Sequence, residues 1–171
     1  TAHKITTIVF DKTGTLTKGK PEVTDILSFG YSEKEVLRLS SIAEKHSEHP
    51  LGEAIIAKAK SLNIKIPDAD SFRAIPGRGV EAKNGSSKIL LGNRKLMAEN
   101  KIQIKSLEKN ISSLEHEGKT VMILAVNKKV AGLIAVADTL KEYSPEAVQK
   151  LHAMGKEVVM ITGDNNITAH A

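Results

Sequence analysis

The sequence predicts an α/β fold in which a Rossmann-type parallel sheet, formed by the two ends of the chain, is interrupted by an inserted α+β domain built on an antiparallel sheet. The apolar, β-branched run at residues 5–10 stops at a polar loop, as a buried strand does. Near the other end, a helix-like segment at 144–155 precedes an apolar run at 157–161, and this alternation is typical of parallel sheets. Between the ends, extended runs flank Asn84-Gly85, the strongest short hairpin signal.

Capping residues and apolar spacing predict the helices. Ser32, with Glu35 three residues later, forms a capping-box pattern, and Pro50 suits the first turn of the next helix. Gly118 stands where a helix C-cap is expected, and Ser144-Pro145 opens the last helix. The apolar positions that recur at helical spacing are Val36, Leu39 and Ala43, then Leu51, Ala54, Ile55, Ala59 and Leu62, then Leu107, Ile111 and Leu114, and finally Val148, Leu151 and Met154.

The middle of the chain is rich in extended segments. A first one is predicted at residues 21–29, and the runs 80–83 and 88–91 pair around the hairpin turn. A second pair is expected between 120–126 and 130–137. These segments and the two helices before them belong together in one antiparallel, helix-covered unit.

The change of character near each end predicts the domain organisation. Residues 1–20 and 137–171 are expected to form the first and second parts of one α/β domain, and residues 21–136 the domain inserted into it. A chain of 171 residues fits one sizeable domain or two small ones. The longest apolar stretch, residues 130–137, has about eight residues and is far shorter than the ~20 that a membrane helix needs, so we expect a soluble polypeptide.

Composition limits the partners of the chain. A formal charge of +5 would suit an anionic ligand, but Lys and Arg are scattered among Glu and Asp, which favours a solvated mixed-charge surface. Only 3% of residues are aromatic and none is Trp, so we expect no aromatic nucleic-acid surface. The absence of cysteine excludes disulfides and thiolate metal sites and fits a reducing compartment.

Two polar loops follow apolar strands, one starting at Asp11 and one at Thr162-Gly163-Asp164. Because ligands gather at the carboxyl ends of parallel strands, both loops should open on the same edge of the sheet. A carboxylate there can attack phosphorus and become an aspartyl phosphate, while loop amides, a hydroxyl and Mg²⁺ hold the charge. Each loop alone reads as a turn, but the seven-residue string at 11–17 is too long for chance recurrence.

The string Asp11-Lys12-Thr13-Gly14-Thr15-Leu16-Thr17 is similar to the phosphorylation motif of P-type ATPases, which belong to the haloacid-dehalogenase-like superfamily. The resemblance implies that Asp11 is the nucleophile within the catalytic motif that includes Lys12, and that the Thr13 carbonyl joins the Asp11 carboxylate on Mg²⁺. Thr162-Gly163-Asp164 resembles the second phosphate-contacting motif, in which Thr162 holds a phosphoryl oxygen, Gly163 belongs to the same catalytic loop, and Asp164 lies close to the phosphates and the metal. Asp138 with Lys141 resembles the acid–base pair near the hinge that returns to the phosphorylation domain.

Thr13 helps to choose between enzyme types. Phosphatases of the superfamily carry a second Asp two residues after the nucleophile as general acid and base, and Thr13 cannot transfer protons at neutral pH. A phosphoenzyme without that group should hydrolyse slowly, which suits a pump.

The stretch 14–20 also nearly matches a phosphate-binding P-loop, but Pro21 stands where that motif needs Ser or Thr. We therefore reject the P-loop interpretation.

Three short motifs in the middle are weak one at a time. Ser47-Glu48-His49-Pro50 suits a helix cap, Gly77-Arg78-Gly79 a turn, and Gly92-Asn93 another cap. In this order they resemble the nucleotide-binding domain of the heavy-metal subfamily of P-type ATPases, for which Ser-Glu-His-Pro is a signature. The resemblance implies adenine contacts from Glu44 and His49, backbone of Gly77 and Gly79 beneath the base and ribose, and a wall completed by Gly92 and Asn93. Adenine needs such a flat, mostly apolar slot.

The resemblance implies ATP and Mg²⁺ as cofactors and, as cargo of a parent protein, a soft or borderline metal ion such as copper, silver or zinc. It places the region at the cytoplasmic face of a membrane whose spans lie outside this sequence. The family's later phosphate-contacting Lys and Gly-Asp-Gly-x-Asn-Asp loop do not occur here, so we expect ATP binding with little or no turnover by this chain. Two alternatives remain: a superfamily phosphatase acting on a small phosphate ester, and a non-catalytic adenine-nucleotide-binding module.

Overall fold

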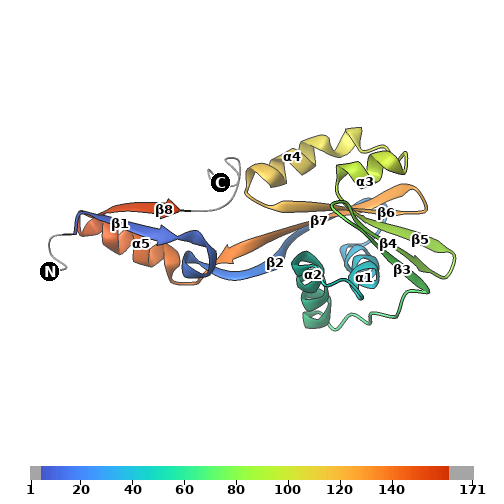
Figure 1. Cartoon of the computed structure of the whole chain (residues 1–171), viewed down its shortest axis with the longest axis horizontal. Helices are drawn as coiled ribbons and strands as arrows, with labels where there is room; N and C mark the ends of the chain where they lie inside the picture. Colours follow the sequence, from blue (N-terminus) through green and yellow to red (C-terminus); the bar gives the residue numbers. More distant parts are fainter. Residues whose placement is uncertain (1–4, 162–171) are drawn as a thin grey trace.

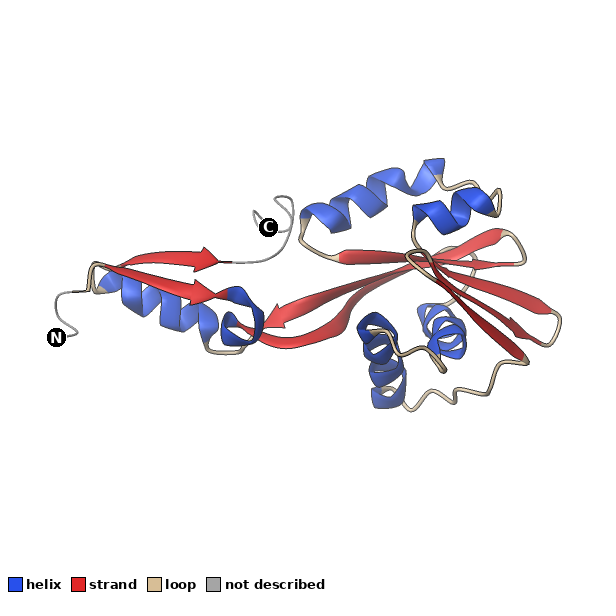
Figure 2. Cartoon of the chain, viewed as in Figure 1, coloured by secondary structure: helices blue, strands red, loops and turns tan. Residues whose placement is uncertain are grey.

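Two sheets lie end to end in an elongated molecule (Figure 1, Figure 2). The structure, a computed structural model, describes residues 5–161, apart from the side chain of Lys12. A two-stranded sheet pairs β1 with β8, and a six-stranded sheet has the order β2-β7-β6-β5-β4-β3. Strands β2 and β7 extend from the large sheet toward the small one and connect the two parts (Figure 1).

The small sheet confirms that the two ends of the chain form a parallel pair. β1 (Thr7–Asp11) and β8 (Glu157–Ile161) are in register from one end to the other, and α5 (Ser144–Ala153) covers one face of the pair (Figure 1). Parallel strands are usually covered on both faces. Here several large apolar side chains remain exposed: Val9, Val159, Met160 and Ile161.

The large sheet is antiparallel throughout, as predicted. Its strands are β2 (Thr17–Ser28), β3 (Ser71–Ile75), β4 (Gly79–Asn84), β5 (Ser87–Gly92), β6 (Thr120–Val126) and β7 (Lys129–Leu140). Both predicted hairpins are confirmed: β4 pairs with β5 and β6 pairs with β7. In the second hairpin Asn127 and Lys128 have φ of 48° and 66°, and positive φ at both central residues is what a type I′ turn requires.

Three features of this sheet differ from the expectation. β2 starts at Thr17 rather than residue 21, and β7 continues to Leu140 rather than residue 137, so the expected domain boundaries fall inside a paired two-stranded ribbon. The strand runs through Pro21, and β2 is an edge strand, the kind of strand in which proline is tolerated. β3 was not predicted, because its polar–apolar alternation covers only four residues, from Ser71 to Ala74, before Ile75 interrupts it.

Helices cover both faces of the large sheet. α1 (Glu33–Glu44) and α2 (Pro50–Ser61) lie on one face, and α3 (Arg94–Glu99) and α4 (Glu108–His116) on the other, with a short turn at Lys105–Leu107 before α4 (Figure 1). Two buried apolar clusters result, one under each helix pair. Neighbouring residues of one strand, such as Leu90 and Leu91, enter opposite clusters, as the alternation of side chains in a strand requires.

The predicted helix ends are largely confirmed. Ser32 Oγ accepts the Glu35 amide hydrogen at 3.2 Å, and Pro50 lies in the first turn of α2. The Glu35 carboxylate does not complete the capping box, because it binds Arg38 at 2.6 and 2.7 Å instead. Gly118 has φ of 73° just after α4, a conformation that glycine adopts at little cost.

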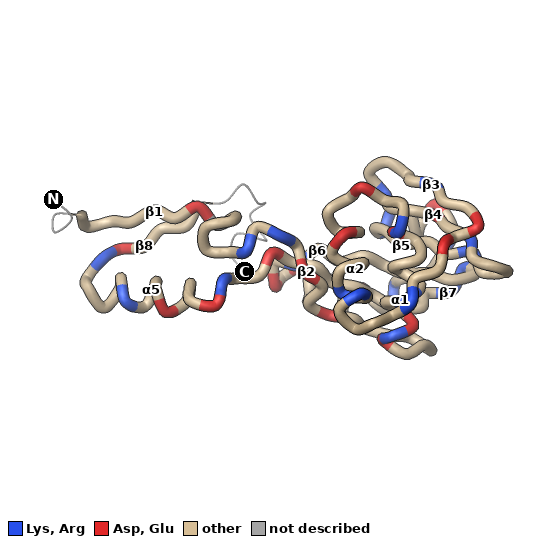
Figure 3. Tube along the Cα trace, turned by 90° about the horizontal axis from the view of Figure 1, so that it is seen from below, with Lys and Arg blue, Asp and Glu red and all other residues tan. Residues whose placement is uncertain are grey.

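Charges of both signs are interspersed along the chain (Figure 3), in agreement with the mixed-charge surface that the sequence predicts. Exposed ion pairs such as Lys18–Glu22 and Lys150–Glu146 account for part of this pattern. Across residues 5–161, no helix has both the length and the apolar character that crossing a membrane demands.

Candidate functional site

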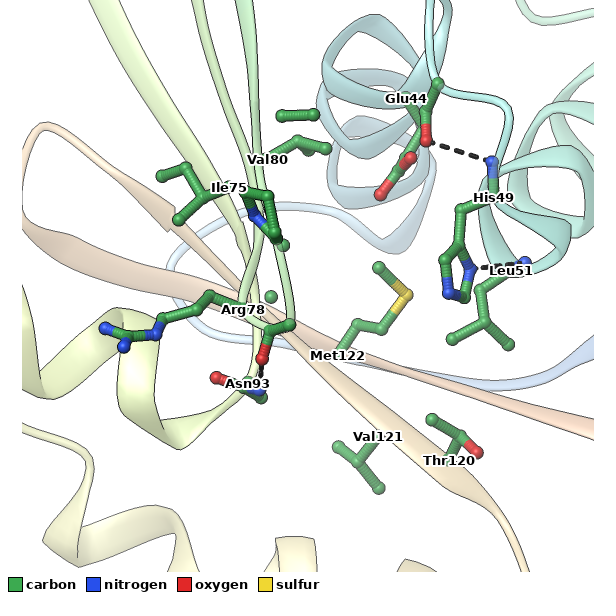
Figure 4. A pocket seen from close by; sticks show the side chains of 16 residues that line it. Glu44, His49, Leu51, Ile75, Arg78, Val80, Asn93, Thr120, Val121 and Met122 are labelled. Carbon is green, nitrogen blue, oxygen red and sulfur yellow. Dashed lines mark hydrogen bonds between the residues drawn. The ribbon is translucent and has the colours of Figure 1, made fainter.

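A cavity of about 390 Å³ opens beside the turn between β3 and β4 (Figure 4). This turn lies at the end of the large sheet from which β2 and β7 extend toward β1 and β8 (Figure 1). The wall combines the end of α1, the start of α2, the β3–β4 turn, the end of β5 and the start of β6. All six residues that the resemblance assigned to a nucleotide line this one cavity: Glu44, His49, Gly77, Gly79, Gly92 and Asn93.

His49 is both a helix cap and a pocket residue. Its Nδ1 accepts the amide hydrogen of Leu51 at 3.2 Å, and its own amide donates to Ser47 Oγ at 3.3 Å (Figure 4). Since Nδ1 accepts, the neutral imidazole must carry its proton on Nε2. The cap therefore fixes the tautomer and leaves Nε2–H as a donor for a ligand.

Glu44 is the last residue of α1 and is only 2% exposed. Its side chain points into the pocket (Figure 4), but Oε2 is fully buried and has no hydrogen-bond partner. Burial raises the pKa of Glu44, against smaller opposing effects of a hydrogen bond from Ser47 and the charge of His49. A Cβ at Gly52 would lie 2.5 Å from Oε2, so the glycine in α2 makes room for this carboxyl.

The three pocket positions occupied by glycine favour glycine for different structural reasons. Gly79 and Gly92 are cross-strand partners. A Cβ at Gly79 would lie 2.1 Å from the Leu91 carbonyl oxygen, and one at Gly92 would lie 2.1 Å from the Arg78 carbonyl oxygen. A Cβ at Gly77 would meet nothing within 4 Å, so the backbone conformation, with φ of +69°, is the feature that favours glycine there. Backbone crowding thus requires two of the glycines, whereas Gly77 adjoins open space.

Asn93 joins α3 to the β3–β4 turn. Its Oδ1 accepts the Leu96 amide hydrogen at 3.2 Å as the cap of α3, and its Nδ2 donates to the Gly77 carbonyl at 2.9 Å. Its backbone amide also donates to the Arg78 carbonyl at 2.8 Å. The Arg78 side chain points away from the cavity (Figure 4) and pairs with Glu99 of α3. The predicted cap is confirmed, and it holds two walls of the pocket together.

Sequence reasoning missed part of the wall. Thr120, Val121 and Met122 of β6 line the cavity, as do Ala74, Ile75 and Pro76 before the predicted turn. In the sequence these residues look like ordinary strand and core positions, because nothing in their spacing separates a pocket wall from the core. Only the observed register places the start of β6 beside the turn.

Asp11 ends β1 directly opposite Ile161, the last residue of β8. The two strands therefore end at one edge, as predicted, and Asp11 is exposed there. The Thr13 amide donates to Asp11 Oδ1 at 3.3 Å. The predicted residues Thr162, Gly163 and Asp164, like the side chain of Lys12, lie outside the part of the chain that the structure describes.

Asp138 binds the start of β2, and Lys141 binds the loop between Asp11 and β2. Asp138 accepts from Thr17 Oγ1 at 2.5 Å and from the Gly19 amide at 2.9 Å, and Thr17 Oγ1 in turn accepts the Gly14 amide hydrogen at 3.1 Å. Lys141 Nζ donates to the Gly14 carbonyl at 2.6 Å. The loop is followed by strand β2, whereas a P-loop leads into a helix; this agrees with the rejection of the P-loop interpretation.

A family model described as a haloacid dehalogenase-like hydrolase matches residues 5–171. The chain belongs to this family. Among curated proteins it is 48% identical to a copper-exporting P-type ATPase of Staphylococcus aureus, over 99% of this chain and 21% of that protein. The chain thus spans about a fifth of the length of the curated relatives it matches.

Solved structures of heavy-metal P-type ATPases are similar to this haloacid dehalogenase-like chain. A zinc-transporting PIB-type ATPase superposes with a TM-score of 0.88 at 38% identity, over 96% of this chain and 27% of that one. The N-domain of a copper-transporting P-type ATPase gives a TM-score of 0.59 at 29% identity, over 68% of this chain and 99% of that one. The resemblance inferred from the motifs and the predicted fold class are both confirmed.

Proposed function

We propose that the chain is the ATP-handling region of a heavy-metal cation pump, which binds ATP in the inserted domain and accepts its γ-phosphoryl group on Asp11. The observation that carries the proposal is the convergence of six motif residues, spread from Glu44 to Asn93, on one cavity of about 390 Å³. Pockets of this size, largely apolar with a few polar groups, are typical of small-ligand sites.

The walls of the cavity suit an adenine ring. Ile75, Val80 and Met122 supply apolar surface, while His49 Nε2–H and the Glu44 carboxyl supply polar groups for the edge of the base. Gly77 has open space where a side chain would otherwise stand. Adenine has a flat apolar face and several polar edge atoms, so each part of this wall has a counterpart on the ligand.

Asp11 suits the phosphoryl acceptor because it is an exposed carboxylate at the carboxyl end of a parallel strand. A carboxylate oxygen attacks the γ-phosphorus, the new P–O bond forms as the bond to the β,γ-bridging oxygen breaks, and ADP leaves. The Asp11 carboxylate and the Thr13 carbonyl are hard oxygen donors that fit Mg²⁺, which would neutralise charge on the transferred group.

The parent protein is proposed to move a soft or borderline metal ion across a membrane, with this region on the cytoplasmic side. Similarity to a copper-exporting and a zinc-transporting ATPase supports that class of cargo. Thr13 favours the pump over a phosphatase of the same family, because it stands where a phosphatase needs a second acid and no hydroxyl can replace that acid at neutral pH.

The test is a calorimetric titration of the purified chain with ATP, beside two variants. His49→Asn keeps a good helix cap and removes the imidazole, so we expect a folded protein with ATP affinity lowered at least tenfold. His152→Asn changes an exposed histidine of α5, far from the cavity in the sequence, and should bind as the original chain does. We expect little steady turnover of ATP. Undiminished binding by His49→Asn, or no binding by the folded original chain, would refute the nucleotide assignment.

A further inference from the structure

The unpaired carboxyl oxygen of Glu44 sets this residue apart from the other polar residues of the pocket. Only two side-chain oxygens of the described chain are buried without a hydrogen-bond partner, Glu44 Oε2 and Ser40 Oγ, and both belong to α1. Leaving an ionised carboxylate oxygen buried and unpaired is expensive, whereas a neutral acid group avoids most of that cost. The geometry therefore favours a proton on this carboxyl.

The position of Glu44 in its helix adds to this preference. Glu44 ends α1, and the last turn of α1 holds no basic residue. The C-terminal end of a helix carries partial negative charge, which disfavours a carboxylate at that position. Burial and the helix end therefore act in the same direction on Glu44.

The charged groups around Glu44 do not reverse this effect. α2 brings His49, whose charge opposes the rise in the pKa only as a minor cause, together with Gly52, which has no side chain. Among the described residues, the half-buried acids of the strands packed against α1 have their own partners: Asp25 pairs with Lys119, and Glu81 with lysine and arginine side chains. Lys45, the next residue in the chain, pairs with Asp68, and no lysine or arginine whose side chain the structure describes pairs with Glu44.

We propose that the pocket binds adenine nucleotide with Glu44 in its neutral, protonated form, so that nucleotide binding takes up a proton from solvent; this rests on the nucleotide-binding function proposed above. A bound base excludes water from the cavity and makes a charge on Glu44 still less favourable. A protonated carboxyl can also donate to an unprotonated ring nitrogen of adenine. Together with His49 Nε2–H, it gives the pocket two donors for a ring rich in acceptors.

The sign of the effect follows from the same argument. Below the pKa of Glu44 in the empty pocket the proton is already present, and binding does not change it. Above that pKa, binding must add a proton, and the affinity falls by up to about tenfold for each further pH unit. Adenine binding should therefore weaken as the pH rises through and beyond this pKa.

The experiment measures proton uptake by titration calorimetry with ATP in two buffers of different ionisation enthalpy, at several pH values and saturating Mg²⁺. Glu44→Gln is the matched variant, because its amide imitates the neutral acid in shape and cannot ionise. Any titration of the ATP phosphates is common to both proteins and cancels in the comparison. We expect net uptake of up to one proton by the original chain relative to E44Q, and an E44Q affinity that stays high where the original weakens.

Each other outcome overturns the inference in a recognisable way. Equal proton uptake by both proteins at every pH would mean that Glu44 does not change protonation, and proton release relative to E44Q would mean that the carboxylate is the bound form. Loss of binding by folded E44Q, with no uptake by the original chain, would likewise assign the contact to the charged form. Absence of binding in both folded proteins would instead remove the nucleotide function on which the inference rests.

Discussion

Substituting two glycines of the same turn tests whether the pocket wall is fixed by backbone crowding. Gly77 and Gly79 both line the cavity and both have positive φ, +69° and +140°. A Cβ at Gly79 would lie 2.1 Å from the Leu91 carbonyl oxygen and 2.5 Å from Gly92 Cα, whereas one at Gly77 would meet nothing within 4 Å. Gly79→Ala and Gly77→Ala therefore differ mainly in what the added methyl group touches.

The expected losses of stability follow from these distances. For Gly79→Ala, a backbone conformation restricted to glycine costs about 1–3 kcal/mol, and overlap with paired backbone atoms that cannot rotate away adds about 1–3 kcal/mol. We expect a total near 4 kcal/mol, a large share of the roughly 5–15 kcal/mol by which domains are stable. For Gly77→Ala only the left-handed backbone contributes, about 1–2 kcal/mol.

Urea unfolding of both variants measures the difference, with ATP titration of the variant that stays folded. Gly77→Ala should unfold at a slightly lower urea concentration and bind ATP more weakly, because its methyl group enters the proposed ligand space. Equal stability of the two variants would refute the account of backbone crowding. Undiminished ATP binding by Gly77→Ala would refute the placement of the base against this turn.

Four further predictions concern side-chain networks. Replacing Arg94 by Met should lower the free energy of unfolding, measured in urea, by about 1 kcal/mol, because its bonds to Glu115 at 2.6 and 2.9 Å are half-exposed. Salt screens such a pair, so a larger loss of stability in high salt would contradict this explanation. Gly52→Ala should lower ATP affinity severalfold, because the new Cβ would lie 2.5 Å from Glu44 Oε2 and displace the carboxyl. The free energy of unfolding should change by less than about 1 kcal/mol. Because the pKa of Glu44 is raised above 4.5, the folded chain binds more protons there than the unfolded one, so stability should fall as pH rises above about 4.5, and E44Q should abolish this fall. Asp138→Asn should reduce hydrogen-exchange protection of the Gly19 amide, which donates to Asp138, by about tenfold, as expected for loss of one bond worth about 1.4 kcal/mol; unchanged protection would show that the start of β2 is ordered without this bond.

Local signals predicted most of the fold because they are properties of a few adjacent residues. The hairpin signal at Asn84-Gly85, the Ser32 cap and the Asn93 cap each act within a few residues, and each is confirmed. The turn itself falls one residue later than the signal, on Gly85 and Ser86, because Asn84 pairs with Ser87. The ends of β2 and β7 were not predictable in this way. Their extra pairing depends on an antiparallel partner more than a hundred residues away in the sequence. A short stretch of sequence around either strand end therefore does not contain the information that fixes where the strand ends.

The candidate site likewise has features that local sequence predicts and features that it does not. The order of the motifs in the chain was enough to name the residues of the pocket, but it did not predict the physical role of each residue. From the sequence, Gly79 and Gly92 were interpreted as glycines that make room for a ligand. The structure shows another reason for glycine at both positions: the two residues are opposite each other in a ladder, and the neighbouring backbone leaves no room for a Cβ. Gly52 carried no signal at all, because its need to be small arises only where α2 packs on Glu44.

The ribbon of β2 and β7 explains how the two sheets can present their sites in a defined relation. Both strands that connect the sheets belong to it, and their ladder continues from Ser28 opposite Gly132 to Thr17 opposite Leu140. Paired strands resist bending independently, so the two connections act as one element. Asp138 binds Thr17 and Gly19 at the point where this element meets the loop after Asp11. Asp138 thus closes this end of the ribbon, while the Thr17 bond from the Gly14 amide and the Lys141 bond to the Gly14 carbonyl join the ribbon to the loop. A change in the orientation of the inserted domain can therefore reach Asp11 through these bonds.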